Sequence, residues 1–234
     1  MKATVDEIRE RFDHDVERFS SLETGQSSVV DAPLALELTV LAAAATNPGA
    51  ARVLDIGCGA GNYTLKLLKA LPQLEVTLID LSRPMLARAV ARVGEAATGK
   101  VTAIQGDIRE LELGQEQFDI VLAAAVFHHL RDDAEWRAVF LKVHEALTPG
   151  GSLWVTDLVS HAVPVVQALI WQRYGDYLTT LGGEAYRDQV FAYSDHEDTP
   201  RPLLYQLDLL REVGFGSVEV LHKNSAFAAF GAVK

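Results

Sequence analysis

The fold is decided by the ten residues Val53–Asn62, which read VLDIGCGAGN. An apolar, β-prone run leads straight into glycines at positions 57, 59 and 61, and a helical pattern of apolar residues begins directly after them. Glycine permits such a tight turn and lets a ligand approach the backbone closely. Because this kind of loop lies at the carboxyl ends of the strands in an open α/β sheet, we expect Gly57, Gly59 and Gly61 to border a ligand site.

Outward from this loop, the sequence alternates between strand-like and helix-like segments. Strand-like runs cover 52–56, 75–79, 101–105, 118–123 and 152–158, and helical periodicity covers 63–71, 85–93 and 134–147. Alternation of this kind predicts right-handed βαβ units and a parallel sheet. After a further helix around 204–213, two strands at 217–221 and 226–233 are expected to form a hairpin that turns at Lys223-Asn224.

The remaining segments are interpreted as parts of one domain that spans residues 1–234. N-terminal helices are expected within 1–48. Residues 159–203 form an insertion beside the ligand-binding edge of the sheet, in which 159–181 is predicted to be helical and 182–202 to be a polar loop. Its aromatic residues either line a substrate pocket or pack beneath a surface helix, and they are Trp171, Tyr174, Tyr177 and Tyr186.

Composition and charge exclude several classes of protein. The chain has 234 residues, with 21 Lys and Arg against 32 Asp and Glu, and its formal net charge of −11 disfavours a nucleic-acid partner. Its single cysteine excludes a disulfide framework and a cysteine-rich zinc site. The longest apolar stretch is shorter than the roughly 20 residues of a membrane-spanning helix, and the acidic N-terminus is unlike a signal peptide. We therefore predict a cytoplasmic protein with no membrane partner, and a homodimer is compatible with the sequence.

The spacing of the glycines and the acids around them indicate the kind of ligand. Dinucleotide binding expects Gly-x-Gly-x-x-Gly, whereas this loop reads Gly-x-Gly-x-Gly, and the Gly-Lys-Ser/Thr of a phosphate-binding loop does not follow it. Asp55, at the end of the first strand, would oppose a pyrophosphate but suits a cationic ligand. Asp80 ends the second strand, where an acid can accept both hydroxyl hydrogens of a ribose. After the third strand, Asp107 is placed to accept from an adenine amino group, with Ile108 and Leu81 on either side of the ring.

Five segments in order resemble the motifs of class I S-adenosylmethionine-dependent methyltransferases. They are 55–61 (DIGCGAG), Asp80, 106–108 (GDI), 118–121 (FDIV) and 147–151 (LTPGG). The resemblance covers roughly residues 50–158 and continues in Gly214-Phe215 and the final strand pair. It implies a doubly wound, Rossmann-like α/β fold whose seven-stranded, mostly parallel sheet has an antiparallel last strand.

The resemblance also implies S-adenosylmethionine as the cofactor and gives roles to the site residues. Gly57, Gly59 and Gly61 would pack against the methionyl part. Asp80 would hold the ribose, and Asp107 with Ile108 would hold the adenine. The cationic sulfonium and ammonium groups of this ligand agree with the acid at Asp55.

The segment 123–130 (AAAVFHHL) follows the fourth strand and in this family commonly lies beside the transferred methyl group. Ala124 stands where many members have a polar residue, often Asn, and is assigned to the cofactor site. His128 is the candidate general base, which is needed only when the acceptor must lose a proton. The alternative is that His128 merely borders the cofactor pocket and His129 packs under the following helix. No metal is predicted, because adjacent histidines seldom point at one ion and no third ligand is evident.

Three functions remain open at this point. The first is methyl transfer to a small-molecule acceptor, which the acidic charge and compact domain favour. The second follows from residues 12–16 (FDHDV), the insertion and the tail, which resemble carboxy-S-adenosylmethionine synthases of tRNA wobble-uridine modification. Those enzymes bind the added carboxylate with an arginine at the position of Leu209, for which Arg201 or Arg211 would have to substitute. The third is a non-catalytic cofactor-binding module.

Overall fold

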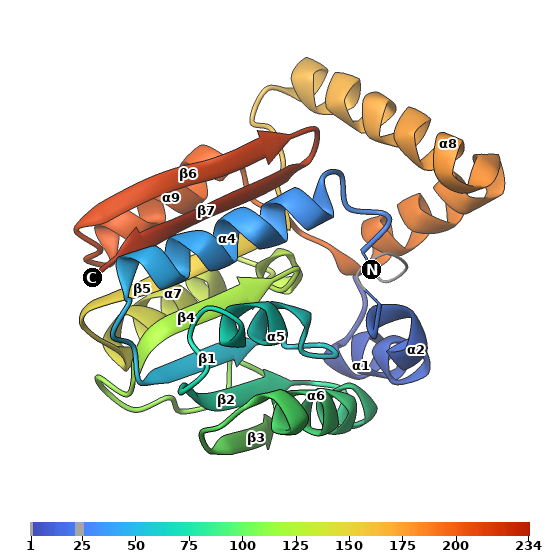
Figure 1. Ribbon diagram of the computed structural model, residues 1–234. Helices are drawn as coiled ribbons and strands as arrows, with labels where there is room; N and C mark the ends of the chain where they lie inside the picture. The colour runs from blue at the N-terminus through green and yellow to red at the C-terminus, as the bar shows by residue number, and fades with distance from the viewer. Residues whose placement is uncertain (1, 22–25) are drawn as a thin grey trace.

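Seven strands form one sheet in the order β3-β2-β1-β4-β5-β7-β6 in the computed structural model, which describes residues 2–21 and 26–234 (Figure 1). The strands are β1 (Arg52–Ile56), β2 (Glu75–Asp80), β3 (Val101–Gln105), β4 (Phe118–Ala124), β5 (Leu147–Leu158), β6 (Ser217–Asn224) and β7 (Phe227–Val233). The first five run parallel, and β7 is antiparallel to both β5 and β6. The predicted Rossmann-like α/β fold with an antiparallel last strand is therefore confirmed.

Helices cover both faces of the sheet, as the alternation of strands and helices requires. The helices α4 (Ala32–Thr46), α5 (Asn62–Leu68) and α6 (Arg83–Ala96) lie on one face, and α7 (Asp133–Ala146) and α9 (Leu203–Glu212) lie on the other (Figure 1). Side chains of β1 alternate between the two layers: Val53 packs under α4–α6, whereas Leu54 and Ile56 pack under α7 and α9. Both layers bury apolar side chains, so the strand ends that carry the site are held rigidly.

Within residues 2–21 and 26–234, three further helices surround the carboxyl ends of the strands (Figure 1). α1 (Val5–His14) and α2 (Val16–Phe19) follow one another with a break at Asp15. α8 (Pro164–Glu197) makes up most of the insertion and continues past residue 182, where the polar loop was predicted to begin. α8 is long, but no helix in the described part of the chain combines the length and apolarity that a membrane span requires.

The prediction of a loop over 182–202 is wrong, because helix α8 extends to Glu197. The helix changes direction at Gly183, whose φ of +78° only glycine adopts without strain. This kink brings Phe191 back onto Trp171, with the two rings stacked at 4.9 Å between centroids. Packing between the two halves of the insertion, which the polar composition of 182–202 does not reveal, stabilises the second half as a helix.

The closing hairpin turns slightly later than predicted. Lys223-Asn224 lies within β6, and the chain reverses at Ser225 and Ala226. Ser225 has a φ of +50°, the left-handed conformation that a tight turn of this kind uses. The expected pairing of the last two strands is otherwise as the sequence indicates.

Candidate active site

The glycine loop follows β1, and its three glycines all have positive φ, at +62°, +50° and +81°. A Cβ at Gly57 would lie 2.4 Å from the Val126 side chain, so close contact with the β4 loop excludes any side chain there. No described atom lies within 4 Å of where a Cβ at Gly59 would stand, which leaves space for a ligand. Gly61 instead faces α6, because its Cβ would lie 3.0 Å from Val93.

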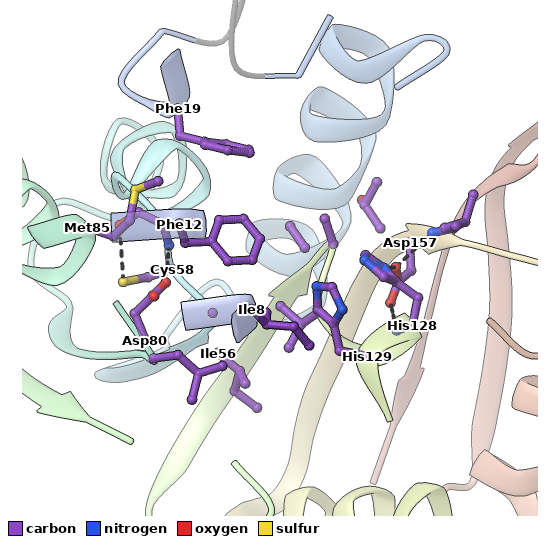
Figure 2. Close-up of a pocket in the computed structure, with 18 of the residues that line it drawn as sticks. Ile8, Phe12, Phe19, Ile56, Cys58, Asp80, Met85, His128, His129 and Asp157 are labelled. Atoms are coloured by element: carbon purple, nitrogen blue, oxygen red, sulfur yellow. Dashed lines mark hydrogen bonds and ion pairs between the residues drawn. The ribbon is translucent and has the colours of Figure 1, made fainter. Parts of the chain in front are cut away.

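A cavity of about 220 Å³ lies at the carboxyl ends of the strands, beneath α1 and α2 (Figure 2). Nearly all of the site residues predicted from the sequence line it: Asp55, Gly57, Gly59, Asp80, Leu81, Asp107, Ile108, Ala124 and His128. Gly61 does not line it. Figure 2 shows Asp80 and His128 on opposite sides of the pocket, with the Phe12 ring of α1 between them.

Two buried carboxylates stand beside the glycine loop. Asp80 accepts hydrogen bonds from the backbone N–H groups of Gly59 and Ser82, each at 2.8 Å. Burial nevertheless raises the pKa of Asp80 to about 6. Asp55 accepts from the Thr64 hydroxyl at 2.6 Å, and burial raises its pKa to about 7. A cation bound nearby would favour the ionised form of both groups.

Asp107 is held by its neighbour Arg109. The guanidinium Nε lies 3.0 Å from each carboxylate oxygen, and Arg109 also reaches Glu135 at 3.2 Å. Burial opposes ionisation of Asp107, but the hydrogen bonds from Arg109 outweigh it and lower the pKa below the ordinary value. The carboxylate is therefore charged and fixed in orientation at the edge of the pocket.

His128 is oriented by Asp157, near the end of β5. The short 3-10 turn Phe127–His129 follows β4, and one Asp157 oxygen accepts from the backbone N–H groups of Phe127 at 2.8 Å and His128 at 3.2 Å. The other oxygen pairs with His128 Nδ1. The second ring nitrogen, Nε2, then lies 3.6 Å from Asp198. Burial lowers the pKa of His128, but the charges of Asp157 and Asp198 outweigh burial and raise it to about 9.

His129 has a different environment. Its Nδ1 lies 3.4 Å from the Asp198 carboxylate, yet neither ring nitrogen makes a hydrogen bond with any described residue. Burial, together with the charges of His128 and Arg11, keeps the pKa of His129 well below its ordinary value, so this ring is neutral. The Phe12 ring meets it edge-on, with 6.1 Å between centroids.

The expectation that no third ligand stands near the two histidines is wrong. Asp198, which caps the end of α8, brings ligand atoms of His128, His129 and Asp198 within 4.8 Å of one another. The positive charge of Arg11 also acts on both histidines and opposes a second cation there. The absence of a metal therefore stays our prediction.

Sequence reasoning missed Asp157, Asp198 and Arg11 as pocket residues. Asp157 shared a detectable signal with Asp80, since both are acids at the carboxyl end of a parallel strand. Asp198 and Arg11 had no such signal. They come from α8 and α1, which meet only in the folded chain.

The N-terminal helices close the pocket. Arg11 binds Glu197 through two guanidinium nitrogens, with Nε at 2.7 Å from Oε1. Asp13 accepts from the Ser82 hydroxyl at 2.6 Å, directly beside Asp80. These contacts hold Phe12 over the cavity.

Comparison with known proteins agrees with this architecture. The family model of a methyltransferase domain matches residues 53–151. A carboxy-S-adenosyl-L-methionine synthase of Chromohalobacter salexigens is 30% identical over 79% of this chain and 68% of the relative. An uncharacterized methyltransferase of Mycobacterium bovis is 34% identical over 46% of the chain, which spans about half (51%) of that relative's length.

Solved structures show the same fold. The 1,6-didemethyltoxoflavin-N1-methyltransferase of Burkholderia thailandensis is 21% identical, with a TM-score of 0.62 over 100% of this chain and 92% of the other. The motifs, the order of the strands and the curated relatives together show that the chain belongs to the class I S-adenosylmethionine-dependent methyltransferase family.

Proposed function

We propose that the protein transfers a methyl group from S-adenosylmethionine to the hydroxyl group of a small-molecule acceptor, with His128 as general base. The observation that carries this proposal is the pair of Asp157 and His128 in the same pocket as the glycine loop and Asp80. A base so placed serves an acceptor that must lose a proton as it reacts.

The residues beside the glycine loop fit the cofactor. Space beside Gly59 admits a ligand against the backbone, and two buried carboxylates, Asp55 and Asp80, match a cationic nucleoside. Asp80 would hold the ribose, and Asp107, Ile108 and Leu81 the adenine. Gly57 and Gly59 would lie beside the methionyl part, and Ala124 beside the reacting group. When bound, the cofactor supplies a methyl group already activated by its sulfonium.

The protein's own contribution to the reaction is orientation and proton transfer. Asp157 binds Nδ1 of His128, which leaves Nε2 facing the cavity. Nε2 accepts the hydroxyl proton of the acceptor, and the Asp157 carboxylate stabilises the resulting imidazolium. Phe12 and Phe19 exclude water above the site, and the insertion adds Tyr174 to the acceptor side.

Synthesis of a carboxylated cofactor is the less favoured alternative. Leu209 is buried in the core under α7, and neither substitute lines the pocket: Arg201 pairs with Asp133 at 2.7 Å and Arg211 with Asp208 at 2.9 Å. Mass spectrometry of ligand that co-purifies with the protein tests this point. A mass increase that matches an added carboxylate would overturn our preference.

The proposed activity is tested by incubating the protein with S-adenosylmethionine and a panel of hydroxylated small molecules. Release of S-adenosylhomocysteine that depends on the acceptor supports methyl transfer. Tight binding of S-adenosylmethionine without release of S-adenosylhomocysteine for any acceptor in the panel would favour a non-catalytic binding module. The charge of −11 supports a small-molecule acceptor rather than nucleic acid, and a cytoplasmic location and a homodimer are part of the proposal.

The affinity for S-adenosylmethionine is expected to rise about tenfold between pH 5 and pH 8. Asp80 and Asp55 have pKa values of about 6 and 7, so both are protonated at the acidic end and ionised at the alkaline end. A cationic ligand binds the ionised pair better. Calorimetry across this range measures the effect, and S-adenosylhomocysteine, which lacks the sulfonium charge, should show a weaker dependence. Equal pH dependence for the two ligands would contradict the role of these carboxylates.

The value of kcat/KM is expected to increase with pH up to about 9, where His128 becomes the free base. Asp198→Asn removes a negative charge that raises the pKa of His128, so the increase in kcat/KM should occur at lower pH in this variant. Asp157 and Arg11 also face this imidazole and are unchanged in the variant. The exposed Asp195→Asn substitution on the same helix is the matched control. A profile that stays in place in Asp198→Asn would show that His128 does not limit the reaction.

A further inference from the structure

The acceptor side of the pocket has apolar walls and one polar corner, which consists of His128, His129 and Asp198. The walls are formed by Ile8, Phe12, Leu130, Tyr174 and Phe227. In the corner, Nε2 of His128 and Nδ1 of His129 approach the same Asp198 carboxylate, at 3.6 and 3.4 Å. Neither distance is that of a good hydrogen bond, so the polar groups of this corner are poorly satisfied by one another.

Charge pairing sets Asp198 apart from the other acids of this region. Asp157 is paired with His128, and Glu197 is bound by Arg11 through two nitrogens. Asp198 is only 7% exposed and accepts a hydrogen bond from the Ser194 side chain, and among the described residues its charged partner is the His128 imidazole at 3.6 Å rather than a Lys or Arg. Its carboxylate keeps acceptor capacity for whatever enters the corner, and the neutral ring of His129 beside it adds one acceptor nitrogen.

From this geometry we infer that the acceptor carries a second hydrogen-bond donor next to the hydroxyl group that is methylated, and that Asp198 binds this second group. The substrate class is then a flat, neutral arene with two adjacent hydroxyls, or with a hydroxyl beside an amino group. The inference rests on the proposed function. When His128 is the free base, Nε2 is an acceptor, and its separation of 3.6 Å from the Asp198 oxygen suits two adjacent groups, each donating to one of them. A ligand with a single hydroxyl would leave Asp198 with only the hydrogen bond from Ser194, and would forgo a second hydrogen bond to this buried carboxylate.

The probes are 4-methylcatechol and 4-methylphenol, which differ by one hydroxyl. Calorimetry with the full-length protein saturated with S-adenosylhomocysteine measures binding, and S-adenosylhomocysteine release measures kcat/KM. We expect the catechol to be favoured about 10–100-fold in both measurements, as expected for a hydrogen bond to a charged group. Asp198→Leu should abolish the difference in affinity between the two probes, while the lower pKa of His128 in this variant changes the turnover of both probes alike. Asp198→Asn, which keeps an acceptor oxygen, should restore part of it, and the exposed Asp195→Asn should keep all of it.

Equal binding and turnover of the two probes by the wild-type protein would overturn the inference while leaving methyl transfer intact. Loss of the catechol preference on adding EDTA would also overturn it, because a metal chelate on the same three side chains would then explain the preference. Failure of the proposed function is distinct: the catechol would bind preferentially in calorimetry, but no acceptor would be methylated.

Discussion

A His128→Gln variant is expected to lose about 10²–10⁴-fold in kcat/KM while it binds S-adenosylmethionine with nearly unchanged affinity. Glutamine preserves much of the side-chain volume and can still donate to Asp157, but its amide does not accept a proton at any pH at which the protein is folded. The loss should fall mainly on kcat, because the acceptor can bind without being deprotonated. Steady-state kinetics with an acceptor that the wild-type protein methylates measures the loss in kcat, and calorimetry measures the affinity for the cofactor.

The matched control is His196→Gln, on the exposed side of the last turn of α8 and outside the pocket. It makes the same chemical change a short distance away and should leave kcat/KM at the wild-type value. Turnover retained in His128→Gln would support the alternative reading, in which this histidine only borders the cofactor pocket. Loss of cofactor affinity in the same variant would instead indicate that the turn after β4 had been disturbed.

The half of the pocket beside the glycine loop was predictable because each of its residues is linked to a local pattern. A strand that runs into alternating glycines fixes the position of Gly59, and Asp80 ends the next strand. In a parallel sheet those strand ends meet, so linear spacing translates directly into proximity. Asp157 obeys the same rule at the end of β5 and could have been found by applying the rule to every strand.

The half of the pocket around His128 was not predictable in the same way. Asp198 reaches His128 only because α8 continues past Gly183 and folds back, and the composition of that segment is polar enough to resemble a loop. Its stabilisation comes from contacts such as Phe191 on Trp171, which join residues on two halves of a kinked helix. Arg11 likewise donates hydrogen bonds to Glu197, which lies 186 residues later in the sequence. Such contacts depend on tertiary packing, which a single sequence does not encode in any local period.

An Asp80→Asn substitution is expected to weaken S-adenosylmethionine binding about 10²–10³-fold, because the ribose loses a charged acceptor for its two hydroxyl groups. Calorimetry measures this loss. Asp119→Asn is the matched control, because Asp119 also accepts from two backbone N–H groups, those of Ala51 and Arg52 at 2.9 Å, but stands at the opposite ends of the strands. Unchanged affinity in Asp80→Asn would show that the ribose binds elsewhere.

Thermal stability separates this ligand role from a structural one. Burial raises the pKa of Asp80 from 3.8 to about 6, so the folded state holds its proton more tightly than the unfolded state does. Stability from this group is therefore present at acidic pH and falls as pH rises from about 4 to 6, by about 3 kcal/mol in total. Asn does not ionise, so in ligand-free protein the variant should lose this pH dependence, and its Tm relative to wild type should be higher at pH 8 than at pH 4. A variant that holds its Tm at pH 8 but binds the cofactor poorly would show that Asp80 is kept ionised for the ligand rather than for the fold.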